Sequence, residues 1–330
     1  MRSVKYQTLT GFTRPAAGGR VAPIEMLRGV KTHALLFMFD ANITIAGAGG
    51  GNVNAESTAR LIDLITIREN GIVRAEITGR MLAYLTSRAQ RQAANIGVLA
   101  SGGAQANTLL HTNYVLNFTS IFGADPAETA FVELNANVPT TVEVQWAANA
   151  EAAMISGTGL TVNSATLGVV QMFDEQSKLM PFFLPRIRRT TSKAISGVQS
   201  GFQIPLMAER QNRIESIVAH SLVDNVSSTA ILTGNVSLRG DRQRWIDNVD
   251  RRVLLNEQRR FFDAPVPALS YLEIYNRLYG KLSEMLVGNQ DENLRLEADV
   301  TGSGTTATID VYTFEKETVP GFTRALPENW

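Results

Sequence analysis

The hexapeptide "TVEVQW", residues 141–146, alternates polar and apolar side chains along its length. Val142, Val144 and Trp146 fall on one side of the chain, and Glu143 and Gln145 fall between them. A period of two is typical of a β-strand that buries one face and leaves the other polar. The stretch therefore predicts a strand with one buried face.

The same kind of stretch returns later in the chain. In "NLRLEAD", residues 293–299, the apolar residue Leu294 follows Val142 by 152 positions. A second pair, "ATLGV" at 165–169 and "ATIDV" at 307–311, is identical at three of five positions and lies 142 positions apart. Two landmarks in the same order, with a hairpin shortened by ten residues, favour a duplicated domain.

An earlier pair of stretches supports the same interpretation. "ARLIDLITIRENGIVRAEITGRM", residues 59–81, and "QNRIESIVAHSLVDNVSSTAILTGNV", residues 211–236, each place an Ile before a carboxylate and end near Thr-Gly. Ile62 and Ile214 are again 152 positions apart, so we expect these two stretches to be equivalent strands.

Length and composition agree with two domains. The chain has 330 residues, of which 44% are apolar, and one core seldom grows to that size. The predicted division is listed in chain order: a basic N-terminal arm at 1–32, a first jelly roll at 33–175, a linker at 176–200, a second jelly roll at 201–316 and a C-terminal tail at 317–330.

The predicted fold class is all-β with inserted helices, arranged as two tandem eight-stranded jelly-roll sandwiches. Strands are expected near 34–46, 59–69, 71–85, 114–122, 129–137, 140–148 and 159–173, and near 202–208, 212–223, 228–239, 292–301 and 305–315. Helices are expected at 87–96, 247–262 and 270–286, where apolar residues recur every three or four positions.

Charge is balanced overall but not along the chain. Lys and Arg together number 31, as do Asp and Glu, whereas the start of the chain is basic and its end is acidic. The basic residues of the arm are Arg2, Lys5, Arg14, Arg20, Arg28 and Lys31. Such an arm can contact phosphate on lipid or nucleic acid, and a solvated terminus is an equally good interpretation. The basic cluster at 184–193 is interpreted as a solvated linker in preference to a phosphate contact.

The sequence offers no constellation for catalysis. There is no cysteine, and the histidines His33, His111 and His220 are far apart. The Gly-rich stretch 46–52 lacks the spacing of a nucleotide-binding loop and is interpreted as a turn. We therefore expect no enzyme, no catalytic residue, no cofactor and no metal site. No transmembrane helix and no secretory signal are expected either.

The duplicated order "LID…ITG…VEVQW…ATLGV" and "RIE…LTG…LRLEA…ATIDV" resembles the double jelly-roll major capsid proteins of tailless, membrane-containing bacteriophages, the tectivirus, corticovirus and finnlakevirus groups. The resemblance covers nearly the whole chain, although it rests on no diagnostic motif. It implies a homotrimeric, pseudo-hexameric capsomer that tiles an icosahedral shell over an internal membrane.

The same resemblance implies the partners and the location. The partners are further copies of the chain, vertex or penton and minor capsid proteins, and the inner lipid membrane reached through the termini, with no sequence-specific nucleic acid. The expected location is the virion capsid, assembled in the host cytoplasm.

Other functions remain open at this point. A carbohydrate-binding or adhesion protein can also be built from two β-sandwiches, and a bicupin-like enzyme would also be duplicated. A tailed-phage capsid protein would share the role but needs a long spine helix, which the first half of the sequence does not predict.

Overall fold

The computed structural model describes residues 4–46, 53–54, 56–90, 104–118, 139–174, 183–206, 212–242, 244–259, 270–276, 286–287, 293–302 and 306–318. The chain forms two compact units, the first comprising most of residues 1–181 and the second most of residues 182–330.

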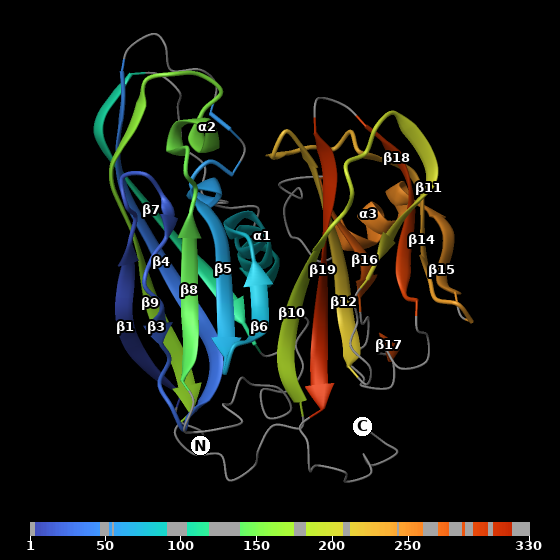
Figure 1. Cartoon of the computed structure of the whole chain (residues 1–330), viewed down its shortest axis with the longest axis horizontal. Coiled ribbons are helices and arrows are strands. Elements are labelled where there is room, and N and C mark those ends of the chain that lie inside the picture. The colour runs from blue at the N-terminus through green and yellow to red at the C-terminus, as the bar shows by residue number, and fades with distance from the viewer. Residues whose placement is uncertain are drawn as a thin grey trace. The chain divides into compact units, whose positions relative to one another are not determined.

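The first unit is a sandwich of two antiparallel sheets (Figure 1). One sheet has the strand order β1 (Lys5–Thr13), β9 (Leu160–Asp174), β4 (Lys31–Ile45) and β7 (Gln105–Asn117). The other has the order β6 (Ile72–Ile77), β5 (Ile62–Glu69) and β8 (Thr140–Trp146), with β2 (Gly19–Arg20) and β3 (Ile24–Glu25) both pairing with β8.

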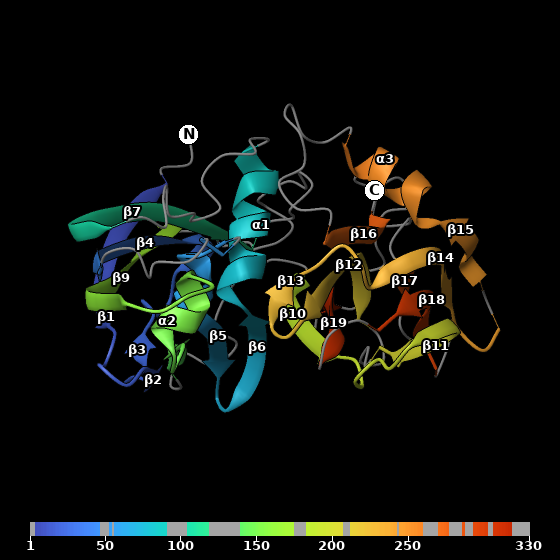
Figure 2. The same ribbon diagram turned by 90° about the horizontal axis from the view of Figure 1, so that it is seen from above.

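The apolar sides of these two sheets form the core of the first unit. Burial alternates along β8, where Val142, Val144 and Trp146 are almost fully buried. The ring of Trp146 lies 6.4 Å from that of Phe39 on β4, so side chains of the two sheets meet between the layers. A 3₁₀ turn (Ala59–Leu61) and the helices α1 (Gly79–Gln90) and α2 (Ala150–Met154) complete the unit, as seen from above in Figure 2.

The second unit is also a two-sheet sandwich. One sheet contains β10 (Phe183–Thr191), β19 (Ala307–Thr318) and β12 (Arg213–Val223), and β12 also pairs with β13 (Val226–Ser227), β16 (Tyr271–Asn276) and β17 (Leu286–Val287). The other has the order β11 (Val198–Pro205), β18 (Arg295–Thr301), β14 (Leu232–Arg239) and β15 (Arg244–Asp250), followed in the chain by α3 (Arg251–Arg259). Residues from both sheets form one apolar cluster, which includes Leu238, Leu296 and Val311.

The two units share one topology. In the first, β9 lies between β1 and β4, and β8 lies beside β5, which pairs with β6. In the second, β19 lies between β10 and β12, and β18 lies beside β14, which pairs with β15. A helix follows β6 and β15, and the next long strand returns to β4 or β12. The prediction of two mostly β sandwiches with inserted helices is confirmed.

Two of the three sequence landmarks are equivalent strands, and one is not. "TVEVQW" and "NLRLEAD" belong to β8 and β18, and "ATLGV" and "ATIDV" belong to β9 and β19. Ile62, however, begins β5, whereas Ile214 lies in β12, the counterpart of β4. The proposed equivalence of 59–81 with 211–236 is wrong, because period-two alternation does not distinguish one strand of a sandwich from another.

Two predicted elements have the wrong type. Residues 79–85, expected as strand, belong to α1, where the Thr78 hydroxyl accepts a hydrogen bond from Met81 N at 3.3 Å and caps the helix. All residues from Gly79 to Arg88 are buried, so no exposed polar face distinguishes the helix there. Residues 271–276, expected as helix, form β16, because pairing with β12 overrides the local apolar spacing. The expected helix at 247–262 is observed as α3, but its first residues extend β15.

The remaining differences concern boundaries. The predicted arm contains β1, which pairs with β9, and the predicted linker contains β10, which pairs with β19 along its whole length. The expected strand at 114–122 begins earlier, as β7 at Gln105. The helix expected at 87–96 overlaps the end of α1 at Gln90. The expected strand at 129–137 and the Gly-rich stretch 47–52 lie outside the described residues.

Candidate assembly surfaces

The three histidines occupy separate places. The imidazole of His220 on β12 stacks on Tyr271 at 4.1 Å and forms a hydrogen bond with the Ser227 hydroxyl at 2.8 Å. His111 on β7 is exposed and binds the Asp40 carboxylate. His33 is buried on β4. Among the described residues, no group of three or more His, Asp or Glu side chains is placed to hold a metal ion. No helix in the described part of the chain is long and apolar enough to cross a membrane.

The basic residues predicted to form one arm lie at two different ends of the first sandwich. Lys5 and Lys31 pair in register with Phe173 and Asp174, at the end of β9. Arg28, whose neighbour Leu27 donates its backbone N–H to Gln171, belongs to that same end.

The other two described members of the set lie at the opposite end. Arg14 donates to the backbone oxygen of Ala147 at 3.1 Å, and Arg20 donates to Gln145 at 3.5 Å. Burial lowers the pKa of Arg14, and Lys31 is only 5% exposed. Arg2 lies outside the described residues. The set therefore does not form one basic surface.

The three arginines of the basic cluster at 184–193 are neutralised within their own sheet. Each arginine of β10 lies beside a carboxylate of β19. The pairs are Arg186–Glu317 at 3.7 Å, Arg188–Glu315 at 3.1 Å and Arg189–Asp310 at 2.9 Å. Burial raises the pKa of Glu315, although Arg188 and a hydrogen bond from Asn212 act in the opposite direction. The cluster was interpreted as a solvated linker; the structure places it in a paired strand.

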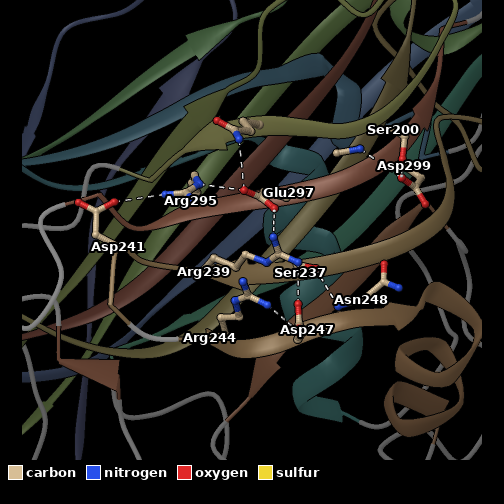
Figure 3. Close-up of polar contacts among 12 residues, drawn as sticks. Ser200, Ser237, Arg239, Asp241, Arg244, Asp247, Asn248, Arg295, Glu297 and Asp299 are labelled. Atoms are coloured by element: carbon tan, nitrogen blue, oxygen red, sulfur yellow. Dashed lines mark hydrogen bonds and ion pairs between the residues drawn. The ribbon is translucent and has the colours of Figure 1, made fainter.

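A charged ladder crosses the outer face of the sheet β11-β18-β14-β15 in the second unit (Figure 3). Its centre is Glu297 on β18, which is 11% exposed and accepts from Arg239 at 2.9 Å, Arg295 at 2.9 Å and Gln203 at 3.2 Å. Arg239 extends the ladder to Asp247 at 2.6 Å. We call this surface the polar face. The ladder links four neighbouring strands, and Glu297, Arg239 and Asp247 alternate in charge along it.

The ladder continues to both sides of this centre. Arg295 reaches Asp241 at 3.4 Å, and Arg244 reaches Asp247 at 3.2 Å. Three arginines thus oppose three carboxylates, and the ladder is neutral. The hydrogen bond from Arg239 lowers the pKa of Asp247, with a smaller contribution from Arg244.

Asp299, on the same face, holds two strands together. It accepts from the Ser200 hydroxyl at 2.7 Å and from the backbone N–H groups of Gly201 at 3.2 Å and Asn235 at 3.0 Å. These bonds, the one from Ser200 most strongly, lower its pKa, because they favour the ionised carboxylate. Asp299 therefore links β11 to β14 across β18.

The first unit repeats this arrangement with different residues. Gln145 on β8 is the counterpart of Glu297, 152 positions earlier, and it too bonds to the strands on both sides. It donates to Asp63 on β5 at 2.8 Å and accepts from Arg20 on β2 at 3.5 Å. Both units therefore have a cross-strand centre at this position, with an amide in the first unit and a carboxylate in the second.

A different surface covers the outer side of the sheet β1-β9-β4-β7. We call it the open face. Its mainly apolar half contains Tyr6, Leu36, Met38, Val115, Val170 and Met172, together with the polar Thr8 and Asn113. Tyr6 and Met38 are 63% and 38% exposed. Next to it, Asp40 and His111 form the pair described above.

The polar half of the open face consists mainly of amides and hydroxyls, with the exposed Leu109 beside Asn42. Asn163, on β9, donates to Asn42 at 2.8 Å, Thr44 at 2.9 Å and Asn107 at 3.3 Å. In the rows from Tyr6–Met172 to Asn42–Ser164, Asp40 and His111 are the only acidic or basic residues among the outward-facing residues that the structure describes.

Comparisons with known proteins identify the architecture. No family model matches the chain, and no curated protein matches it. Among solved structures, the chain is similar to the STIV MCP, with a TM-score of 0.73 and 12% identity over 98% of this chain and 100% of that one. It is also similar to the major capsid protein P2 from bacteriophage PM2, with a TM-score of 0.61 and 14% identity over 97% and 99% of the two chains. For VP54 of PBCV-1 the TM-score is 0.63, with 9% identity over 99% and 98%.

The chain has the double jelly-roll fold. The similarity extends over both units and leaves almost none of either chain unmatched, so the tandem arrangement itself is shared. At identities of 9–14%, what is shared is the fold. The sequence-based prediction of two jelly rolls in one chain is confirmed.

Sequence reasoning missed both surfaces. The polar residues Arg295, Glu297 and Asp299 were visible in "NLRLEAD", but their partners lie on β11, β14 and the segment after it, about 50 to 100 positions away. The alternation of "NLRLEAD" was the available signal, and it lacked the strand register that brings the partners together.

Proposed function

We propose that the chain is a viral major capsid protein whose homotrimer forms a pseudo-hexameric capsomer of an icosahedral shell. The observation that carries this proposal is the duplicated sandwich, which matches over at least 97% of this chain proteins whose titles name them as capsid proteins. Three copies of a chain with two similar units present six similar units around a threefold axis. Such a capsomer tiles a shell as a hexagon would.

The proposed role is structural and places the protein in the virion, with assembly in the host cytoplasm. Support comes from charged side chains on the described sheet faces, which form ion pairs and hydrogen bonds with residues of neighbouring strands. Glu297 and Asp299 each join three strands, and Arg188 and Arg189 are bound to carboxylates of β19. These groups stabilise the sandwich. Vertex and minor capsid proteins are the further partners that this role implies.

Contact with an inner membrane is proposed only for the basic residues at one end of the first unit. Lys5 and Arg28 are exposed there, near the end of β9. On vesicles containing anionic lipid, Lys5→Gln and Arg28→Gln should each weaken binding, because each removes one favourable charge. Arg20→Gln, an exposed change at the opposite end, is the control and should bind as the wild type does. Equal binding by all four proteins would exclude this contact.

The first experiment on the capsomer is the native mass by light scattering after size exclusion. One chain has a mass of 36.0 kDa, and the proposal expects a single peak at three times that value, with hexagonal particles by electron microscopy. A monomer at every accessible concentration would overturn the proposal.

A further inference from the structure

We infer that the open face of the first unit is the docking surface for a second copy of this chain. The inference rests on the proposed self-assembly and goes beyond it by naming the surface. It starts from a difference between two sheets that the duplication made equivalent.

Equivalent positions on β9 and β19 differ in exposure. Gly168, Val170 and Met172 face outward on β9 and are all partly exposed. Of their counterparts 142 positions later, Asp310 and Tyr312 are 0% exposed and Phe314 is 5% exposed.

The next strand shows the same contrast. Met38 on β4 pairs with Gly168 and is 38% exposed, whereas His220, which pairs with Asp310, is 0% exposed. The outer side of this sheet is thus buried within the chain in the second unit and open in the first.

The open face has the composition of a surface that is covered in an assembly. A solvated sheet face normally carries Lys and Glu, and interfaces are depleted of them at their centre. Here the ionisable groups Asp40 and His111 bind each other, so covering them leaves neither without a partner.

Gly168 leaves room for a neighbouring side chain within the face. A Cβ at Gly168 would lie 3.0 Å from the Met38 Cε, so the glycine lets the Met38 side chain lie across the neighbouring strand. An apolar surface of this kind excludes water efficiently when a partner covers it.

The size of the face fits a second protein chain. Four strands at a spacing of about 4.8 Å are roughly 19 Å wide, and about ten residues at 3.3 Å each give roughly 33 Å of length. The product, roughly 630 Å², is of the same order as the approximately 800 Å² that each partner contributes to a specific interface.

The occupant is another copy of the same chain, because the proposed capsomer is built from copies of this chain and the charged ladder of its polar face balances three arginines against three carboxylates. The ladder therefore brings no net charge to the open face, where an unpaired charge would be costly to bury. A contact between the open face and a different surface of the next copy is head-to-tail, which is the kind of contact that closes into a ring.

The test uses site-specific labelling, which the absence of native cysteine makes possible. M38C places a thiol in the open face, and I72C places one at a 48% exposed position outside it. In the assembled protein we expect maleimide to label M38C at least about tenfold more slowly than in the diluted single chain, while I72C labels equally fast in both. Equal rates for M38C in both states would overturn the inference.

A disrupting variant gives a second readout. Met38→Arg should lower the self-association constant about 100-fold, because an unpaired charge at the centre of an interface is costly, and Ile72→Lys should leave it unchanged. Circular dichroism of both variants checks that they are folded. If Met38→Arg still forms the wild-type assembly, the inference fails and the capsomer proposal stands. A wild-type dimer that Met38→Arg dissociates supports the inference and overturns the trimer, and a wild-type monomer overturns both.

Discussion

Leu296→Ala should destabilise the second unit more than any surface change on the same sheet. Leu296 lies on β18 and is 0% exposed. In register with it lie Ile204 on β11 and Leu238 on β14, which are 1% and 0% exposed. The side chain is thus enclosed on both sides as well as from the opposite sheet.

The expected loss follows from this enclosure. Removing three buried carbons costs about 2.4 kcal/mol in transfer free energy, at about 0.8 kcal/mol per methylene. A cavity that cannot collapse adds to this, and Leu→Ala changes in cores cost about 2–5 kcal/mol in total. Because strands lie on both sides, we expect a loss of about 3–4 kcal/mol. For a unit of this size, that lowers the melting temperature by roughly 6–16 °C.

The assay is urea unfolding followed by circular dichroism, with calorimetry for the melting temperature. Val198→Ala is the matched control, since Val198 lies on β11 of the same sheet but is 82% exposed, and it should change the stability by less than about 0.5 kcal/mol. A loss below about 1 kcal/mol for Leu296→Ala would refute the reasoning, because β18 would then not lie in a close-packed core.

Three further changes test other parts of the fold. Arg74→Met should cost about 3–5 kcal/mol, because it removes a guanidinium 2.8 Å from the Glu69 carboxylate where both side chains are 4% exposed; thermal melting measures this, and a loss under about 1 kcal/mol would contradict it. Gly79→Ala should lower the melting temperature, since a Cβ there would lie 2.2 Å from the backbone oxygen of Ala59; an unchanged value would show that the start of α1 can shift freely. The pKa of Asp299 is lowered from 3.8 in the folded state. The ionised carboxylate therefore stabilises the folded protein above pH 3.8, and this stabilisation is lost as the pH falls through the folded pKa. The urea midpoint of Asp299→Asn should therefore lie below that of the wild type at pH 7 and converge with it in acid, and a difference independent of pH would contradict the assignment.

Alternation made some strands predictable from sequence, and its limits explain the errors. Residues 140–148 and 159–173 were predicted within a few positions of β8 and β9, because each carries one buried and one polar side. Residues 79–88 are all buried, so no exposed polar face marked a helix there, and the first part of α1, up to residue 85, was expected as strand.

The surfaces were harder to predict than the strands for a related reason. Glu297 acquires its role from Arg239 and Gln203, which register alone brings beside it. The open face is recognised only when the exposure of Met38 is compared with that of its counterpart, His220. Neither the strand register nor the exposure can be read from one sequence, because the pattern of apolar residues fixes which side of a strand is buried and leaves the neighbouring strand unspecified.

The duplication itself argues that the two outer surfaces diverged for different partners. The buried positions stayed apolar in both units, as Val144 and Leu296 show, because any core needs them. The outward positions changed in kind, from Gly168 to Asp310 and from Gln145 to Glu297. Had both units kept the same outer residues, one chain would present two copies of one surface, and a neighbour could bind to either. With unlike surfaces, a second copy has one way to dock, and the proposed head-to-tail contact has a fixed direction. A fixed direction is what permits a ring of three chains to close in place of an open chain of variable length.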